Sequence, residues 1–200
     1  MNWAVTAYLI VGLGNPGPDY ADTRHNAGYR VVETLCQRLG VRLTGRSFAS
    51  KNARTMIDGK KVVLLCPLTY MNESGKSVRA CVRTLGVPLE RLLVVHDDLD
   101  LPLGRIKLAR KGGSGGHKGV SSIIRELGGG DFPRLKIGIG RPRHEEPVSD
   151  FVLSPFYPDE RETWQAVLDL AVGGCELFVL QGVEKAMNLI NCRNLADKEV

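Results

Sequence analysis

Two segments of the chain carry the residue types of a general base. His25 lies in Thr-Arg-His-Asn-Ala-Gly, and Asp97 lies in His-Asp-Asp-Leu-Asp, which directly follows an apolar run. A histidine whose pKa is near neutral can take a proton from water, and a carboxylate bonded to its other ring nitrogen fixes the tautomer that does so. Together the two residues would form a general base for hydrolysis. Two alternatives stay open: Asp97, Asp98 and Asp100 could hold a divalent metal ion, or they could form an acidic loop.

A glycine-rich stretch covers residues 111–119, Lys-Gly-Gly-Ser-Gly-Gly-His-Lys-Gly. Successive glycines let backbone N–H groups approach an anion, especially just before a helix. The stretch is not a Walker A loop, because the Gly-Lys-Ser/Thr ending is absent. It therefore predicts either a loop that contacts a ligand or a plain flexible loop.

Two asparagines follow predicted strands. Gly12–Gly17 resembles part of a dinucleotide-binding fingerprint, but Pro16 removes a backbone donor and no helix opens directly after it. The stretch is better explained as a tight turn, which places Asn15 at the carboxyl end of a strand, where open α/β sheets bind ligands. Asn72 offers a donor and an acceptor to a ligand, or it caps a helix.

The elements that must position these residues alternate in the manner of an α/β fold. Apolar runs predict strands at 8–13, 54–57, 61–66, 91–96, 105–109 and 134–140. Helical spacing of apolar residues predicts helices at 26–39, 74–85, 120–127, 158–180 and 183–192. We expect one domain over residues 1–200, with a twisted, mixed, mostly parallel sheet and helices on both faces. Residues 141–156 are expected to form a mobile lid, and residues 195–200 a frayed tail.

Composition narrows the class of protein. A chain of 200 residues with 43% hydrophobic and 24% charged residues suits a single globular domain and argues against disorder or a collagen-like structure. The five cysteines include no CxxC pair, so we do not expect a zinc ribbon. We expect the protein to work in a reducing compartment. No signal peptide is evident, and no apolar run approaches the length of about 18 residues that spans a membrane.

Positive charge is concentrated in one segment. The formal net charge is +5, yet residues 103–145 alone hold ten Lys or Arg against three acids, a net of +7. Concentrated positive charge is the expected footprint of phosphate binding, although a solvated basic surface would look the same.

Six strings in register resemble bacterial-type peptidyl-tRNA hydrolases, at 9–17, 23–28, 70–75, 96–100, 112–119 and 134–142. The resemblance runs from residue 8 to beyond residue 156. It implies an enzyme that cuts the ester between a peptide and the 3′ end of a tRNA, with no metal or other cofactor. It further implies that His25 is the catalytic base, that Asp97 orients it, and that Asn15 and Asn72 position water and substrate.

The same resemblance and the basic segment give the remaining expectations. Substrate contacts are expected from Tyr20, Tyr70, Met71, Asn72, Gly115, His117 and Lys118. Contacts to tRNA phosphates are expected from Lys107, Arg110, Lys111, Arg134 and Lys136. The partner would be peptidyl-tRNA, and the protein a cytoplasmic monomer that avoids membranes.

Lys118 departs from the family pattern, in which an asparagine usually follows the histidine. If the role of this position is to donate its backbone N–H to the ester oxygen, lysine serves as well as asparagine and adds a positive charge. If the side-chain amide matters, activity or specificity would differ. Some relatives with altered residues near this loop bind RNA in intron splicing, so an RNA-binding protein without hydrolase activity stays an alternative.

Overall fold

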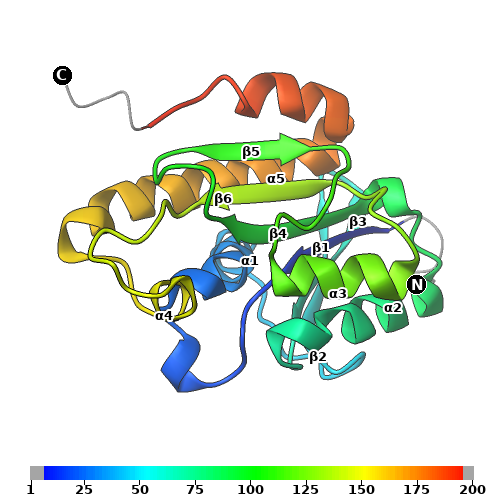
Figure 1. The fold of residues 1–200 in the computed structure, drawn as a ribbon. Coiled ribbons are helices and arrows are strands. Elements are labelled where there is room, and N and C mark those ends of the chain that lie inside the picture. The colour runs from blue at the N-terminus through cyan, green and yellow to red at the C-terminus, as the bar shows by residue number, and fades with distance from the viewer. Residues whose placement is uncertain (1–6, 196–200) are drawn as a thin grey trace.

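A six-stranded sheet with the order β2-β3-β1-β4-β6-β5 forms the middle layer of the computed structural model, which describes residues 7–195 (Figure 1). The four inner strands β3, β1, β4 and β6 are parallel, and β2 and β5 are antiparallel edge strands. The expected mixed, mostly parallel sheet is confirmed. Its strands are β1 (Tyr8–Gly12), β2 (Ser50–Ile57), β3 (Lys60–Pro67), β4 (Leu92–Asp98), β5 (Ile106–Ala109) and β6 (Arg134–Gly138).

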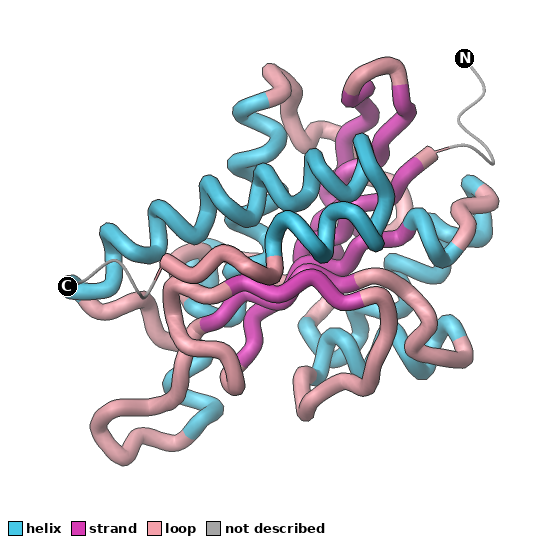
Figure 2. The backbone as a smooth tube through the Cα atoms, turned by 90° about the horizontal axis from the view of Figure 1, so that it is seen from above, coloured by secondary structure: helices cyan, strands magenta, loops and turns pink. Residues whose placement is uncertain are grey.

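Helices cover both faces of the sheet, as predicted, and Figure 2 shows them on either side of the strands. Successive side chains of a strand point to opposite faces, so Leu9 of β1 packs in one apolar cluster and Ile10 in the other. The Ile10 side is covered by α1 (Ala27–Arg38) and α5 (Arg161–Ile190), and the Leu9 side by α2 (Ser74–Leu85) and α3 (Lys118–Leu127).

The topology places a crevice beside β1. Its two neighbours, β3 and β4, are parallel to it, so the carboxyl ends of all three strands meet at one edge of the sheet. The next helix after β1 lies on one face and the next helix after β3 on the other, which is the arrangement that opens a ligand-binding crevice in α/β sheets. Asn15 follows β1 and Asp97 lies near the end of β4, so both reach this edge.

Close backbone packing brings the start of α1 to the same edge. A Cβ atom on Gly28 would overlap the carbonyl oxygen of Val95 in β4, and one on Gly12 would overlap the carbonyl oxygen of Gly28. Only glycine allows this approach. Because the first turn of α1 lies directly on β1 and β4, His25 just ahead of it lies next to the end of β4.

Two helical details differ from the sequence expectations. The predicted lid contains a short helix, α4 (Val148–Val152), which is too short to give a helical pattern in the sequence. The two predicted C-terminal helices are joined in α5, but Gly182 has non-helical angles (φ 79°, ψ 170°) and separates them, while Gly173 and Gly174 remain helical.

The end of the chain is described up to Leu195, whose N–H donates to the carbonyl oxygen of Gly104. The rest of the predicted tail, 196–200, lies outside the described residues.

The long C-terminal helix is a core element. The stretch Pro158–Ile190 is long and apolar enough to cross a membrane, judged by length and composition alone. Its residues Val167, Cys175 and Phe178 are fully buried in the apolar cluster on the Ile10 side of the sheet. Packing against the sheet therefore accounts for the apolar character of this helix.

Candidate active site

His25 and Asp97 meet at the carboxyl edge of the sheet, although 72 residues separate them in sequence. Nδ1 of His25 lies 3.0 Å from Oδ1 and 2.9 Å from Oδ2 of Asp97. The carboxylate is 3% exposed and His25 is 9% exposed. A carboxylate accepts only, so Nδ1 carries the proton and the lone pair of His25 lies on Nε2.

A second histidine holds the same carboxylate. Nε2 of His117 lies 2.9 Å from Oδ1 of Asp97. Nδ1 of His117 accepts from the backbone N–H groups of Gly119 (3.1 Å) and Val120 (3.2 Å) and thereby caps α3. An acceptor nitrogen carries no proton, so His117 is the neutral tautomer that donates from Nε2.

A third histidine, His96, packs edge-on against His117, with ring centroids 4.9 Å apart. Its Nδ1 lies 2.7 Å from the carbonyl oxygen of Asp97, so Nδ1 is the donor and Nε2 an acceptor. Nε2 is buried and has no partner among the described residues. Burial, with the neighbouring His117, lowers the pKa of His96 to about 3, so this ring is neutral at physiological pH.

The charges of the site favour a carboxylate beside a titratable imidazole. Burial alone would raise the pKa of Asp97, but the rings of His25 and His117 outweigh burial and hold it well below its usual range. Burial alone would lower the pKa of His25, but the charge and hydrogen bond of Asp97 prevail, and the net pKa is raised. Lys118 opposes that rise by its positive charge.

Asn15 is held in one orientation by its neighbours. Its Oδ1 accepts from the backbone N–H of Met71 at 3.0 Å. Its backbone N–H donates to Oδ1 of Asn26, and Nδ2 of Asn26 donates back to its carbonyl oxygen. Because Oδ1 is already engaged, Asn15 presents its NH₂ group as a donor. Asn26 is 2% exposed and was not singled out from the sequence, since burial of a polar side chain has no local signal.

These residues open into a groove of about 520 Å³. Six of the residues expected to act in catalysis or substrate binding line it: Asn15, His25, Asp97, Gly115, His117 and Lys118. The opposite wall is largely apolar and comes from α4 and the loop after β4, with Leu99, Val148, Val152 and Leu153. This wall was missed in the sequence because α4 itself was missed.

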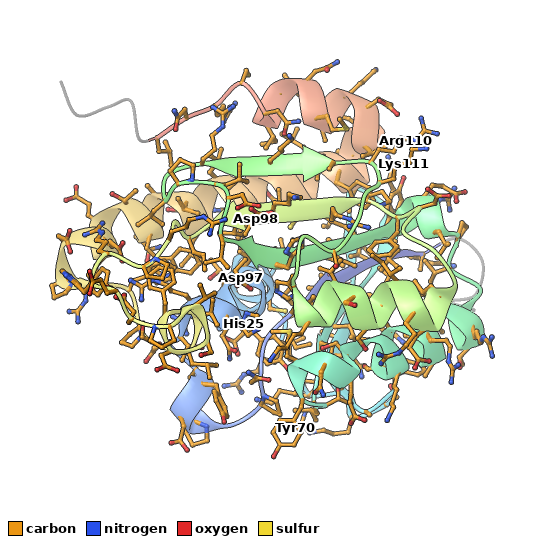
Figure 3. The ribbon with its side chains drawn as sticks, viewed as in Figure 1. His25, Tyr70, Asp97, Asp98, Arg110 and Lys111 are labelled. Carbon is orange, nitrogen blue, oxygen red and sulfur yellow. The ribbon has the colours of Figure 1, made fainter. Side chains whose placement is uncertain are left out.

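Four other expected residues do not line the groove: Tyr20, Tyr70, Met71 and Asn72. The side chain of Met71 is 4% exposed and packs in the core, so its backbone N–H is what serves the site. Tyr70 is 66% exposed and lies apart from His25 and Asp97 in Figure 3. Asn72 is exposed, and its carbonyl oxygen accepts from Arg125.

The side chains of His25, Asp97 and His117 belong to residue types that can ligate a metal ion. One ligand atom each of His25, Asp97 and His117 lies within 4.8 Å of the others. However, Nε2 of His117 carries a proton directed at Asp97, so no lone pair is offered there. Asp98 and Asp100 pair with Lys136 and Arg141. The arrangement fits a hydrogen-bonded triad better than a set of metal ligands.

Comparisons with known proteins identify the family of this chain. The family model described as peptidyl-tRNA hydrolase matches residues 9–198. The chain belongs to the peptidyl-tRNA hydrolase family. A peptidyl-tRNA hydrolase of Thermosynechococcus vestitus is 49% identical, covering 96% of this chain and 97% of its own. One of Carboxydothermus hydrogenoformans is 50% identical, covering 92% and 98%.

A solved structure of the family agrees with the fold. The crystal structure of peptidyl-tRNA hydrolase from Acinetobacter baumannii superposes with a TM-score of 0.88 at 41% identity and covers 97% of each chain. The resemblance inferred from the six strings is therefore confirmed, and the chain is a hydrolase of this family.

Arg134 does not have the surface position that phosphate binding by a member of this family would need. It is 0% exposed and its guanidinium lies over the Phe132 ring, 4.4 Å from the centroid. Nη1 donates to the carbonyl oxygen of Gly113 (2.6 Å) and Nη2 to that of Gly130 (3.1 Å). The expected phosphate contact is wrong for this residue, which instead anchors the base of the glycine-rich loop.

The other four expected phosphate ligands keep some exposure. Lys136 pairs with Asp98 at 2.8 Å and Arg110 with Glu184 at 3.3 Å. Lys107 and Lys111 are exposed. Figure 3 shows Arg110 and Lys111 together beyond the end of β5, away from the labelled His25 and Asp97.

Arg24, next to His25, ties the candidate site of this hydrolase to α4 and to the residues that follow α4. Its guanidinium is buried, donates to Glu160 at 2.7 Å, to the Ser154 hydroxyl and to the Pro155 carbonyl oxygen, and lies 4.1 Å from the centroid of Phe151 in α4. One buried side chain thus holds the turn that carries the histidine against the helix that lines the groove. Nothing in the sequence indicates that Arg24 is buried.

Proposed function

We propose that this protein hydrolyses the ester between the peptide and the tRNA of peptidyl-tRNA, with His25 as the general base. The observation that carries the proposal is the bond from Nδ1 of His25 to Asp97, which leaves the Nε2 lone pair of a groove-lining histidine for a water molecule. The released tRNA would return to translation in the cytoplasm, and the protein would act as a monomer without a metal ion.

The reaction proceeds by direct attack of water. His25 removes a proton from the water as the oxygen attacks the ester carbonyl, and Asp97 stabilises the imidazolium that forms. Among the described residues no Ser or Cys hydrogen-bonds to His25, so the arrangement favours water over an enzyme nucleophile. His25 returns the proton to the ribose oxygen as the tRNA leaves.

The glycine-rich loop supplies donors for the oxyanion. The N–H groups of Gly119 and Val120 are occupied by the His117 cap, and the N–H of His117 donates to Ser114. Of the described loop residues that line the groove, Ser114, Gly115, Gly116 and Lys118 have backbone N–H groups that donate to no described residue. Preorganised donors of this kind stabilise the charge that develops in ester hydrolysis. A lysine serves this role as well as an asparagine, because the donor is the backbone.

Peptide recognition is assigned to the two walls of the groove. The NH₂ group of Asn15 faces carbonyl oxygens of the peptide, and Val148 and Leu153, each more than two-fifths exposed, contact its side chains. Asn72, Tyr20 and Tyr70 remain candidates for substrate contacts outside this groove, and Lys107 and Lys111 for tRNA phosphates.

The proposal is tested with N-acetyl-aminoacyl-tRNA and unblocked aminoacyl-tRNA, each with and without a chelator. Release of N-acetyl-amino acid, unchanged by the chelator and slower for the unblocked substrate, is expected. Tight tRNA binding without release would show an RNA-binding protein instead of a hydrolase. Loss of turnover with the chelator would show a metal-dependent reaction.

A further inference from the structure

The β2 edge of the sheet carries a second concentration of positive charge. Arg42, Arg46, Lys51 and Arg54 are all exposed, and the sequence holds no Asp or Glu between Glu33 and Asp58. These four residues form what we call the β2-edge cluster. They lie outside the basic segment 103–145, in the part of the chain whose overall charge is slightly acidic.

Local backbone structure brings cations of the cluster together. Gly45 and Asn52 form an antiparallel bridge, with N–H···O distances of 2.9 and 3.1 Å. Arg46 and Lys51 adjoin this bridge on its turn side, Lys51 in β2 and Arg46 in the loop before it. Like charges on adjacent segments repel each other. An anion bound between them would remove that repulsion.

Protein groups leave much of this charge uncompensated. Arg46 donates to the carbonyl oxygens of Leu43 and Gly45, and neither Arg42 nor Lys51 has an ion-pair partner in the described part of the chain. In the segment 103–145, Arg110, Lys136, Arg141 and Arg143 pair with acids and Arg134 is buried, whereas Lys107 and Lys111 are exposed and pair with no acid among the described residues.

The shape of the cluster suits phosphate. Arg42 and Arg54 line a concave surface of about 360 Å³, together with Thr44, Ser47 and Asn52. Guanidinium groups bind phosphate oxygens in a bidentate manner, and hydroxyl groups add further donors. A lysine on an edge strand also discourages sheet-to-sheet association, but that role needs no concave surface with two arginines.

The cluster borders the edge of the sheet where the groove opens. Ala49, in the turn between Arg46 and Lys51, accepts from the N–H of Leu68 at 2.8 Å. Leu68 follows β3, and three residues later the N–H of Met71 holds Asn15 of the groove. The turn that carries Arg46 and Lys51 therefore lies at the same edge of the sheet as the groove that would take the end of a polyanion.

We propose that the β2-edge cluster is a second RNA-binding surface, which contacts the phosphate backbone of the tRNA whose 3′ end lies in the groove. The identity of the polyanion as RNA rests on the proposed function. The surface contacts phosphates without reading bases, so its contribution falls as salt rises.

The test compares wild type with Arg46→Gln/Lys51→Gln and with Arg46→Glu/Lys51→Glu. Binding of deacylated tRNA is measured over a range of salt. The neutral double variant is expected to reduce the slope of log K against log salt by about one to two. The acidic variant, whose edge strand still carries charge and so still resists sheet-to-sheet association, is expected to bind tRNA more weakly still. The control is Arg83→Ala/Arg161→Ala, which removes two exposed cations from elsewhere and should leave the slope unchanged.

Two substrates identify the RNA. A rise in KM for full-length peptidyl-tRNA, with no change for an N-acetyl-aminoacyl-CCA fragment, assigns the surface to the body of the substrate tRNA. Unchanged KM for both substrates, with weaker binding of a duplex RNA that lacks the 3′ end, would overturn the proposal, because the surface would then serve a separate RNA. Wild-type tRNA and duplex binding in both folded variants would overturn the proposal. Failure of wild type to cleave the CCA fragment and full-length substrate would instead overturn the proposed function.

Discussion

His117 joins the first turn of α3 to the carboxylate of Asp97. One ring nitrogen caps the helix and the other donates to the carboxylate, so the glycine-rich loop ends at a fixed point beside the His25–Asp97 pair. The backbone donors of the loop and the proposed base, His25, are thereby held in fixed positions relative to each other.

The two bonds of His117 can be separated by substitution. Asparagine is a good N-cap but is too short to reach Asp97, whereas alanine loses both bonds. We expect His117→Asn to keep most of the stability and to lower kcat. His117→Ala should lower kcat as well and cost a further 0.5–2 kcal/mol or so of unfolding free energy. Thermal melts and steady-state rates check both variants; a fully active His117→Asn would show that the contact to Asp97 is dispensable.

The pH–rate profile should move in opposite directions in two variants. His25 accepts a proton only when neutral, so the rate falls as pH falls through its pKa. Asp97 raises that pKa and Lys118 lowers it. Asp97→Asn should therefore shift the acid limb of kcat/KM to lower pH, with a lower maximum because tautomer control is lost. Lys118→Met should shift the acid limb to higher pH. Shifts in the same direction would contradict the assignment of His25 as the titrating group.

Arg134 should affect turnover and not phosphate binding. Arg134→Gln removes both bonds to the glycine-rich loop region, so kcat should fall while the salt dependence of tRNA binding stays as in wild type. Lys107→Ala is the matched comparison: this exposed cation should reduce the salt slope by about one and leave kcat unchanged. A reduced slope with normal kcat for Arg134→Gln would restore it as a phosphate ligand.

The Arg24–Glu160 ion pair should contribute more to the free energy of unfolding than the neighbouring Arg143–Glu160 pair does. Both side chains are buried, and breaking such a pair costs about 3–5 kcal/mol. Arg143 binds the same Glu160 at 3.0 Å but is half exposed, and such a pair contributes about 0–1 kcal/mol. Urea unfolding of Arg24→Met and Arg143→Met measures the difference. Equal losses would mean that burial of Arg24 does not strengthen its role.

The elements of this molecule that depend on local sequence pattern were predicted correctly from the sequence. Apolar runs, alternation and the Asp58-Gly59 hairpin signal located all six strands, although β2 begins at Ser50 and not at Arg54. The carboxyl-edge rule for α/β sheets placed Asn15 and Asp97 at one edge of the sheet. The pairing of His25 with Asp97 came from a resemblance and from chemistry, and the geometry brings the two together.

The remainder depends on tertiary partners. Arg24 and Arg134 look like surface cations in the sequence, because nothing local shows that an acid, a carbonyl group or an aromatic ring will enclose them. The five residues of α4 are too few for a helical period, so the apolar wall of the groove was not foreseen. Met71 lies within a matching string, yet only its backbone reaches the site.

The central claim, that His25 activates the attacking water, is tested most directly by the single-turnover rate of N-acetyl-aminoacyl-tRNA hydrolysis by His25→Ala, measured with its affinity for deacylated tRNA. The account predicts a rate lower by about 10²–10⁴-fold at unchanged tRNA affinity, because only general-base assistance is removed. A His25→Ala enzyme that turns over within a few-fold of wild type would contradict it.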